Sequence, residues 1–169
     1  MTLRLRPLRL EDRDAAIAGH RAMITEHFPL LLGWSDDLDW AEYLRTIDEI
    51  SRSTAVSADR VPATLLAADV DGTLVGRASI RFALNDWLAL RGGHIGYGVL
   101  AEHRRQGYAT EILRQALVVA RSHGVERVLI TCDDTNDASA AVIERCGGTL
   151  ERVVPASDGD VEFRRYWID

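Results

Sequence analysis

The alternation of hydrophobic and polar residues along the chain predicts a sheet built from strands and short helices. Stretches with a period of two, or rich in β-branched residues, indicate strands, and apolar residues that recur every three or four positions indicate helices. The predicted strands are 2–10, 61–70, 73–84, 93–100, 125–132, 149–154 and 161–168. The predicted helices are 11–23, 36–53, 108–123 and 137–146. This order of elements is that of a single α/β or α+β domain.

Turn residues indicate how some of these segments are connected. Asp71-Gly72 lies between two β-rich segments and predicts an antiparallel hairpin, and Ser157-Asp-Gly159 predicts a second hairpin near the end of the chain. Segment 85–93 is expected to be a connection between two strands. Only the strand–helix–strand unit from His94 to Cys132 requires a parallel pair. We therefore expect one mixed, mostly antiparallel sheet of about seven strands with about four helices.

The composition is that of an ordinary globular protein of one domain, spanning residues 1–169. Hydrophobic residues make up 47% of the chain, and the mean hydropathy is -0.08. The longest apolar stretches are far shorter than the roughly 20 residues that cross a bilayer. Residues 1–7 alternate Leu with Arg and contain no apolar core of a signal peptide. These features predict a cytoplasmic protein with no membrane partner.

Charge and cysteine content remove several classes of function. All 20 basic residues are Arg, so the Lys that a phosphate-loop NTPase or a pyridoxal-phosphate enzyme requires is absent. A net charge of -6 argues against a general nucleic-acid binder, whose affinity comes from basic side chains. The two cysteines, Cys132 and Cys146, lack the paired spacing of a zinc site and are expected to be free thiols. We expect no metal and no nucleic-acid partner.

A candidate phosphate site lies where a predicted strand leads into a predicted helix, at Arg104-Arg-Gln-Gly-Tyr-Ala109. Unpaired N–H groups at a helix start, together with the positive end of the helix dipole, favour an anion. Gly107 would let the backbone curl around that anion, and Arg104 and Arg105 would add charge. The alternative is a plain basic turn before a helix.

The segments around this turn resemble the GNAT superfamily of acyl-CoA-dependent N-acyltransferases. The resemblance is carried by Gly92-Gly-His-Ile-Gly-Tyr-Gly-Val-Leu100, by Arg104-Arg-Gln-Gly-Tyr-Ala109, which is similar to the family's R/Q-x-x-G-x-G/A motif, and by the Asn-containing segment 136–148. Within the family, the chain looks like predicted bacterial acetyltransferases. The resemblance implies a GNAT-like sheet whose fourth and fifth strands splay apart, and acetyl-CoA as co-substrate in the gap.

By this resemblance, the pantetheine arm would lie along the fourth strand and the N–H of Val99 would polarise the thioester carbonyl. The pyrophosphate would sit on the N–H groups of 106–110. Asn136 would hold the cofactor or a water, or serve only as a helix N-cap. The implied cofactor-binding residues are Val99, Leu100, Ala101, Arg104, Arg105, Gln106, Gly107, Tyr108, Ala109, Thr110 and Asn136.

The sequence offers one candidate for the general base and one for the general acid, His94 and Ser139. His94 lies in the fourth strand, where many relatives carry a Glu, and an imidazole titrates near neutral pH; it is either the general base or a structural histidine that braces the sheet. Many relatives place a Tyr four residues before the Gly that ends the last helix, where it protonates the leaving thiolate. This chain has Ile143 there, so Ser139 or a water held by Asn136 would take that role, or the thiolate would leave unaided.

The expected activity is transfer of acetyl from acetyl-CoA directly to a primary amine of a small molecule or peptide. Trp34, in its apolar loop, and Asn85 are candidates for contact with the acceptor, although a Trp is more often part of a core. One alternative is a CoA-binding sensor of the same fold with weak or no turnover. Another is a small-ligand binding protein unrelated to CoA. A homodimer is compatible with the sequence.

Overall fold

The computed structural model describes residues 2–156 and 161–169, and the predicted turn at 157–159 lies outside these ranges. The described strands are β1 (Leu3–Pro7), β2 (Ala63–Val70), β3 (Thr73–Arg81), β4 (Ile95–Val99), β5 (Val128–Asp133), β6 (Thr149–Val154) and β7 (Phe163–Ile168). The described α-helices are α1 (Arg13–Ile24), α2 (Trp40–Arg52), α3 (Asp86–Leu90), α4 (Tyr108–Ser122) and α5 (Asp137–Arg145). Two 3-10 turns occur, η1 (Leu10–Asp12) and η2 (Ala101–His103).

The strands form two antiparallel sheets, in the orders β1-β2-β3-β4 and β5-β7-β6. The turn between β2 and β3 has Asp71 and Gly72 both at positive φ, 51° and 88°, which matches the twist that a two-residue hairpin needs. The hairpin is therefore as predicted, and so is the pairing of β6 with β7. The predicted α/β fold class, with seven strands, is confirmed.

The predicted parallel pair is not formed by the described strands. β4 and β5 diverge, and an isolated bridge between Gly93 and Ile130 lies where they approach each other. A Cβ at Gly93 would lie 2.3 Å from the carbonyl oxygen of Leu129, so the close approach depends on glycine there. Beyond this bridge the two strands splay, as the family resemblance implied, and what looked like one mixed sheet is two sheets.

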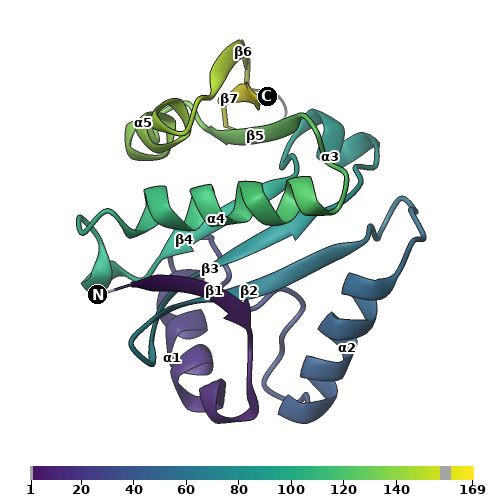
Figure 1. Cartoon of the computed structure of the whole chain (residues 1–169), viewed down its shortest axis with the longest axis vertical. Helices are drawn as coiled ribbons and strands as arrows, with labels where there is room; N and C mark the ends of the chain where they lie inside the picture. Colours follow the sequence, from purple (N-terminus) through teal and green to yellow (C-terminus); the bar gives the residue numbers. More distant parts are fainter. Residues whose placement is uncertain (1, 157–160) are drawn as a thin grey trace.

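Helices cover both faces of the four-stranded sheet. α4 lies between this sheet and the smaller sheet, whereas α1 and α2 cover the opposite face (Figure 1). Two clusters of buried hydrophobic side chains result, one around Ile112, Leu113 and Ile80 under α4, the other around Leu30 and Trp40 next to α1 and α2. The sheet is therefore fixed from both sides, which holds the splayed end of β4 in place.

Two expectations about helices need correction. Segment 85–93 contains the short helix α3, because the side-chain oxygen of Asn85 accepts a hydrogen bond from the N–H of Leu88 and caps it. The second helix begins at Trp40 rather than at 36, since Asp39 is its N-cap and accepts from the N–H of Glu42. Such local capping was not read from the hydrophobic pattern.

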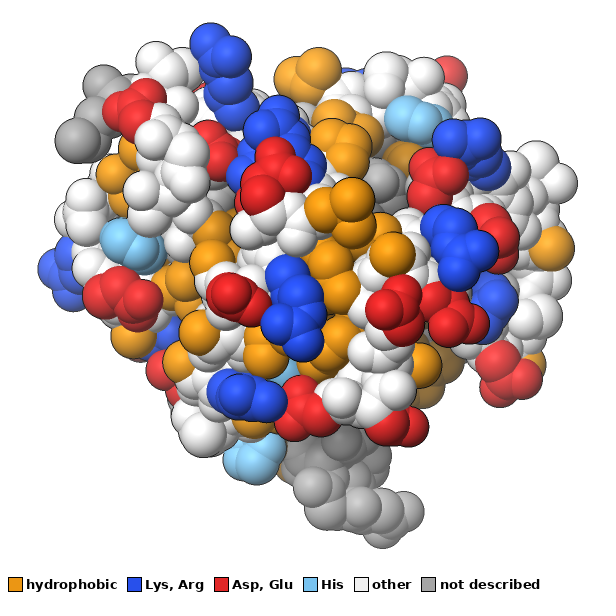
Figure 2. Space-filling view, turned by 90° about the horizontal axis from the view of Figure 1, so that it is seen from below, with side chains coloured by type: hydrophobic (Ala, Val, Ile, Leu, Met, Phe, Trp, Pro, Cys, Tyr) orange, Lys and Arg blue, Asp and Glu red, His pale blue; other side chains and the backbone are white. Residues whose placement is uncertain are grey.

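Acidic and basic side chains alternate on the end of the molecule formed by α1 and α2. Figure 2 views this end from below, and its blue and red side chains are interspersed around hydrophobic ones. Ion pairs such as Arg21 with Asp36 and Arg52 with Asp48 belong to this pattern. This face carries no broad basic surface of the kind that nucleic-acid binding uses.

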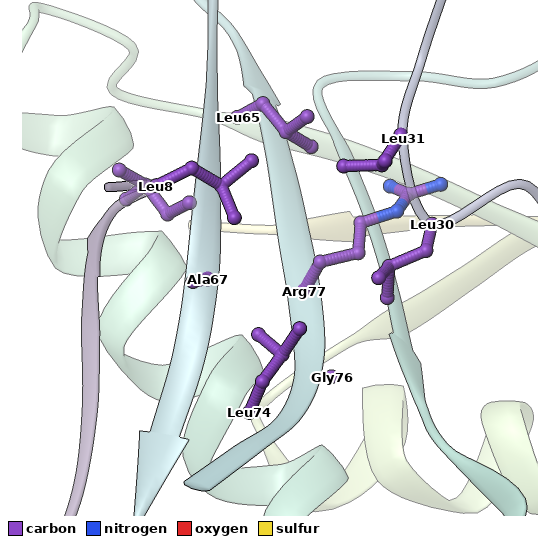
Figure 3. A pocket seen from close by; sticks show the side chains of 9 residues that line it. Leu8, Leu30, Leu31, Leu65, Ala67, Leu74, Gly76 and Arg77 are labelled. Atoms are coloured by element: carbon purple, nitrogen blue, oxygen red, sulfur yellow. The ribbon is translucent and has the colours of Figure 1, made fainter. Parts of the chain in front are cut away.

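Arg77 ties the loop after α1 to the sheet. Its guanidinium donates to the carbonyl oxygens of Gly96 and Pro29, both at 3.0 Å, and lies 4.1 Å from the centre of the Phe28 ring. Figure 3 shows this side chain pointing between Leu30 and Leu31 beside a small gap with apolar walls. The gap is closed to a water-sized molecule, so it is not a ligand site. Arg77 instead holds Phe28 against β4.

Candidate active site

A cleft of about 930 Å³ opens where β4 and β5 separate. β4 and β5 line it, together with the start of α4, α5 and the end of α1 with the loop that follows. Its volume is near the upper end of the range for small-molecule and cofactor sites. The splay of the two strands therefore produces a cavity large enough for an extended ligand.

The backbone of β4 presents unused hydrogen-bonding groups to this cleft. The N–H of Leu100 bonds to the carbonyl of Val75, and the N–H of Arg81 bonds to the carbonyl of His94. In an antiparallel ladder, alternate residues bond to the same partner strand, so the intervening residues Tyr97 and Val99 direct their N–H and C=O groups to the other edge, where the C=O of Val99 already accepts from Arg104. That edge is the cleft, and the predicted N–H of Val99 faces it.

Glycine in β4 makes room at the same place. A Cβ at Gly98 would lie 2.5 Å from a ring carbon of Phe28 and 2.9 Å from the methyl carbon of Met23. These two side chains therefore pack directly on the backbone of β4 and close one side of the cleft. Gly98 therefore marks a close approach of other side chains to the backbone of this strand.

The start of α4 has the features of an anion site. The first main-chain hydrogen bond of the helix runs from the N–H of Glu111 to the carbonyl of Gly107, so the preceding N–H groups point out of the helix end. Gly107 has a φ of 82°, and a Cβ built there would meet no atom within 4 Å. Arg105, exposed and at a φ of 63°, lines the cleft beside it. The start of α4 thus combines open space at Gly107, unpaired N–H groups and the positive charge of Arg105.

Arg104 is held differently from its neighbour. Its Nη2 pairs with the carboxylate of Glu26 at 2.5 Å, and its Nε donates to the carbonyl oxygen of Val99 at 3.0 Å. This arrangement joins the end of α1 to the end of β4 across the cleft wall. Much of the charge of Arg104 is therefore balanced by Glu26, and Arg105 adds a second positive charge to the turn before α4.

Asn136 and Ser139 lie on the opposite wall, at the start of α5. The side-chain oxygen of Asn136 accepts from the N–H of Ser139 at 3.0 Å, which is an N-cap. Both residues line the cleft, so the amide nitrogen of Asn136 can still bind a ligand. The two roles considered for Asn136 are compatible.

His94 is buried outside the cleft, and its geometry favours the structural role over that of a base. Its Nδ1 accepts the N–H of Leu129 at 2.9 Å, so in the neutral ring the hydrogen is on Nε2 and no lone pair is left to take a proton. Burial, and then the positive charge of Arg81, lower the pKa of His94 to about 4. This imidazole braces β4 against β5 at neutral pH.

The two predicted substrate contacts, Trp34 and Asn85, do not line the cleft. Trp34 packs edge-on against Trp40 and Tyr43 in the cluster between α1 and α2. Asn85 caps α3 and donates to the carbonyl oxygens of Ser57 and Ala58. Both side chains are therefore used in packing or in local hydrogen bonds.

Most of the predicted cofactor contacts line the cleft, but three do not. The residues that line the cleft are Val99, Arg104, Arg105, Gly107, Tyr108, Ala109, Thr110 and Asn136. Leu100, Ala101 and Gln106 do not line it, and Leu100 is 4% exposed with its N–H bonded to Val75. Its side chain packs on Gly19, so Leu100 supports the cleft from behind.

The cleft also contains residues that the sequence did not single out. Tyr97 extends from β4, and its hydroxyl lies 3.0 Å from the Oγ of Ser139. Met23 and Phe28 enter from the other side. The alternation of glycine with larger residues in β4 could have indicated that Tyr97 shares a face with Ile95 and Val99, but its partner on α5 depends on the tertiary structure.

Neither cysteine is prepared for nucleophilic chemistry. Both Cys132 and Cys146 are free, as expected, and burial raises the pKa of each thiol. A buried thiol with a raised pKa is mostly protonated at neutral pH and reacts slowly. Within the described ranges, no group of three or more His, Cys, Asp or Glu side chains is arranged to hold a metal ion, and no helix is long and apolar enough to cross a bilayer.

Comparison with known proteins identifies relatives at the level of family and fold. Residues 2–149 match the family model of the acetyltransferase (GNAT) domain. No curated protein sequence matches the chain. The family match covers all the elements that line the cleft.

Several solved structures share the fold. RimJ of Mycobacterium smegmatis, in complex with CoA-disulfide, has a TM-score of 0.71 and 19% identity over 98% of this chain and 81% of its own. RimL, a ribosomal L7/L12 alpha-N-protein acetyltransferase in complex with coenzyme A, has a TM-score of 0.70 and 20% identity over 99% and 93%. The putative acetyltransferase yncA of Salmonella typhimurium, with acetyl-CoA, has a TM-score of 0.65 and 14% identity over 99% and 94%. At these identities the likeness establishes the fold.

Proposed function

The chain belongs to the GNAT acetyltransferase family, and we propose that it transfers the acetyl group of acetyl-CoA directly to a primary amine of a small molecule or peptide. The observation that carries this proposal is the cleft between β4 and β5, which has free strand N–H groups at one end and a helix start with a positive-φ glycine at the other. Similar structures that hold CoA or acetyl-CoA support the choice of co-substrate.

The two ends of the cleft suit the two ends of acetyl-CoA. The pyrophosphate would bind the outward N–H groups at the start of α4, next to Arg105. The pantetheine arm would extend along the open edge of β4 as an added strand. The thioester carbonyl would then accept from the N–H of Val99, which stabilises the oxygen as negative charge develops on it.

The amine would attack the carbonyl carbon, so that a C–N bond forms and the C–S bond breaks. The nitrogen loses one proton and the sulfur of CoA gains one. Ser139 lines the cleft and is our candidate for giving the proton to sulfur. Because the geometry of His94 argues against it as base, the amine would arrive unprotonated and a water would accept the proton that its nitrogen loses on attack.

A CoA-binding sensor of the same fold is the second candidate function, favoured by Ile143, which is fully buried where many relatives carry a proton-donating tyrosine. A screen of primary amines for release of CoA from acetyl-CoA separates the two functions. The enzyme proposal predicts release that depends on both the protein and a particular amine. Tight binding of acetyl-CoA with no release above the background for any amine would overturn it in favour of the sensor.

A further inference from the structure

Tyr97 and Ser139 link the two walls of the cleft through their hydroxyl groups. Tyr97 comes from β4 and Ser139 from the first turn of α5, and their oxygen atoms are 3.0 Å apart. Both residues line the cleft. This contact lies at the point where the two walls approach each other, beside the backbone edge of β4 that includes Val99.

The environment of Tyr97 keeps its hydroxyl protonated, and therefore able to donate a hydrogen bond to Ser139. Burial raises the pKa of Tyr97, so the phenol stays protonated at any pH at which the protein functions. Its other neighbour, the carbonyl oxygen of Ser139, is 3.4 Å away, which is long for an O–H donor. The better acceptor is the Oγ of Ser139. A serine hydroxyl that accepts one hydrogen bond keeps its own hydrogen, which can point elsewhere.

We propose that Tyr97 is a positioning residue that holds the hydroxyl of Ser139 with its hydrogen directed at the sulfur of the departing CoA thiolate. This inference rests on the proposed function and deepens it. Ser139 already donates its backbone N–H to the Asn136 side chain, so its backbone is held and two side-chain torsions are left to set, one that places Oγ and one that directs its hydrogen. A hydrogen bond from the Tyr97 hydroxyl to Oγ restricts both torsions.

The proton inventory of the step balances without any further reactant. The attacking nitrogen loses a proton as the C–N bond forms, and the sulfur needs one as the C–S bond breaks. Ser139 can take a proton from the nitrogen side, directly or through a water, as it gives its own hydrogen to sulfur. Tyr97 neither gains nor loses a proton overall.

No other side chain of α5 is suited to this task. Ile143, one turn further along the helix, is fully buried and has no proton to give. Glu144 accepts a hydrogen bond from the hydroxyl of Tyr166, on the side of α5 that faces β7. Within the part of the chain that the structure describes, Ser139 is therefore the hydroxyl of α5 that meets a residue of β4.

The test uses Tyr97→Phe, which keeps the ring and removes the hydroxyl. Tyr166→Phe is the matched control, because Tyr166 is also a buried tyrosine whose hydroxyl contacts another side chain but does not line the cleft. We expect Tyr97→Phe to lower kcat about tenfold, with the dissociation constant of acetyl-CoA changed less than twofold, and Tyr166→Phe to leave kcat unchanged. Melting curves of both variants check folding.

A double-mutant cycle then separates positioning from an independent contribution. If Tyr97 acts through Ser139, Tyr97→Phe should cost little more in the background of Ser139→Ala, whereas Ser139→Thr, which keeps a hydroxyl, should retain most of the turnover. Equal losses in both backgrounds, or a Tyr97→Phe variant with normal kcat, would overturn this inference and leave the proposed function intact. Should the Tyr97 variant fail to fold, a fully active Ser139→Ala would overturn it instead.

Turnover is followed as CoA release with the best amine and with water as acceptor, since both reactions expel the same thiolate. A wild-type protein that binds acetyl-CoA but releases no CoA with either acceptor would remove the proposed function, and this inference with it.

Discussion

Replacing Gly107 by alanine should strongly weaken the binding of acetyl-CoA at the proposed coenzyme site and leave the fold almost unchanged. Gly107 has a φ of 82° with open space where its Cβ would be. Alanine in this left-handed region costs roughly 1–2 kcal/mol of stability. The added methyl group would occupy the position where we expect a phosphate oxygen to meet the N–H groups of α4. Loss of one hydrogen bond to a charged group, about 1.5–3 kcal/mol, weakens binding roughly 10- to 150-fold.

Gly124 provides a closely matched control at the other end of the same helix. It has a φ of 84°, and a Cβ there also meets nothing within 4 Å, but it does not line the cleft. Gly124→Ala and Gly107→Ala should therefore lower the free energy of unfolding of the unliganded protein by similar amounts. They should differ only when acetyl-CoA is present.

The assay is thermal or chemical unfolding with and without acetyl-CoA. At 100 times the dissociation constant, acetyl-CoA should stabilise the wild type and Gly124→Ala by about 2.7 kcal/mol. With binding weakened 10- to 100-fold, the same concentration should stabilise Gly107→Ala by only about 1.4 to 0.4 kcal/mol. Equal stabilisation of both variants would refute the assignment of this turn as the phosphate site.

Two further predictions concern charged groups. Arg105→Ala should weaken acetyl-CoA binding about 3- to 10-fold at low salt, and the difference from the wild type should shrink as salt rises. Arg114→Ala, on the exposed side of α4, should have no effect on binding. A loss of affinity in Arg105→Ala that is independent of salt would contradict the electrostatic role. For His94, the imidazole takes up a proton below about pH 6.5 in the unfolded chain but only near pH 4 in the folded protein. The stability that depends on this difference is fully present above about pH 6.5 and falls on acidification, by about 2 kcal/mol at pH 5. Denaturant titrations at pH 7 and pH 5 should show that His94→Gln loses less of its free energy of unfolding on acidification than the wild type does. The kcat/KM of this variant at pH 7 should stay within a few fold of the wild type. A large loss of kcat/KM in a folded variant would restore His94 as base.

Local sequence features were sufficient to predict most of the strands, helices and turns. Asp71-Gly72 and the glycine after α4 define a turn and a helix end by backbone conformation, which depends on few neighbours. The turn at Gly107 could be predicted for the same reason, because a helix start and its N–H groups are properties of adjacent residues. Such features are encoded within a few positions of the sequence.

Contacts between distant segments were beyond the reach of the sequence. His94 has the residue type and strand position of a base, but its ring is used by the N–H of Leu129, a residue 35 positions away. Trp34 lies in an apolar loop that could line a pocket, yet Trp40 and Tyr43 cover it. Tyr97 meets Ser139 only because α5 packs beside α4. The tertiary partner of each of these side chains could not be predicted from its residue type.

Hydrogen–deuterium exchange in the presence of acetyl-CoA tests the central claim most directly, namely that the splay between β4 and β5 is the coenzyme site. The N–H groups of Tyr97 and Val99, and those at the start of α4, have no partner strand or helical turn in the free protein. Acetyl-CoA should therefore slow exchange in peptides that cover 95–101 and 106–112, and leave the hairpin of β2 and β3 unchanged. Protection that is absent from both peptides, or that is centred on another part of the molecule, would contradict the account.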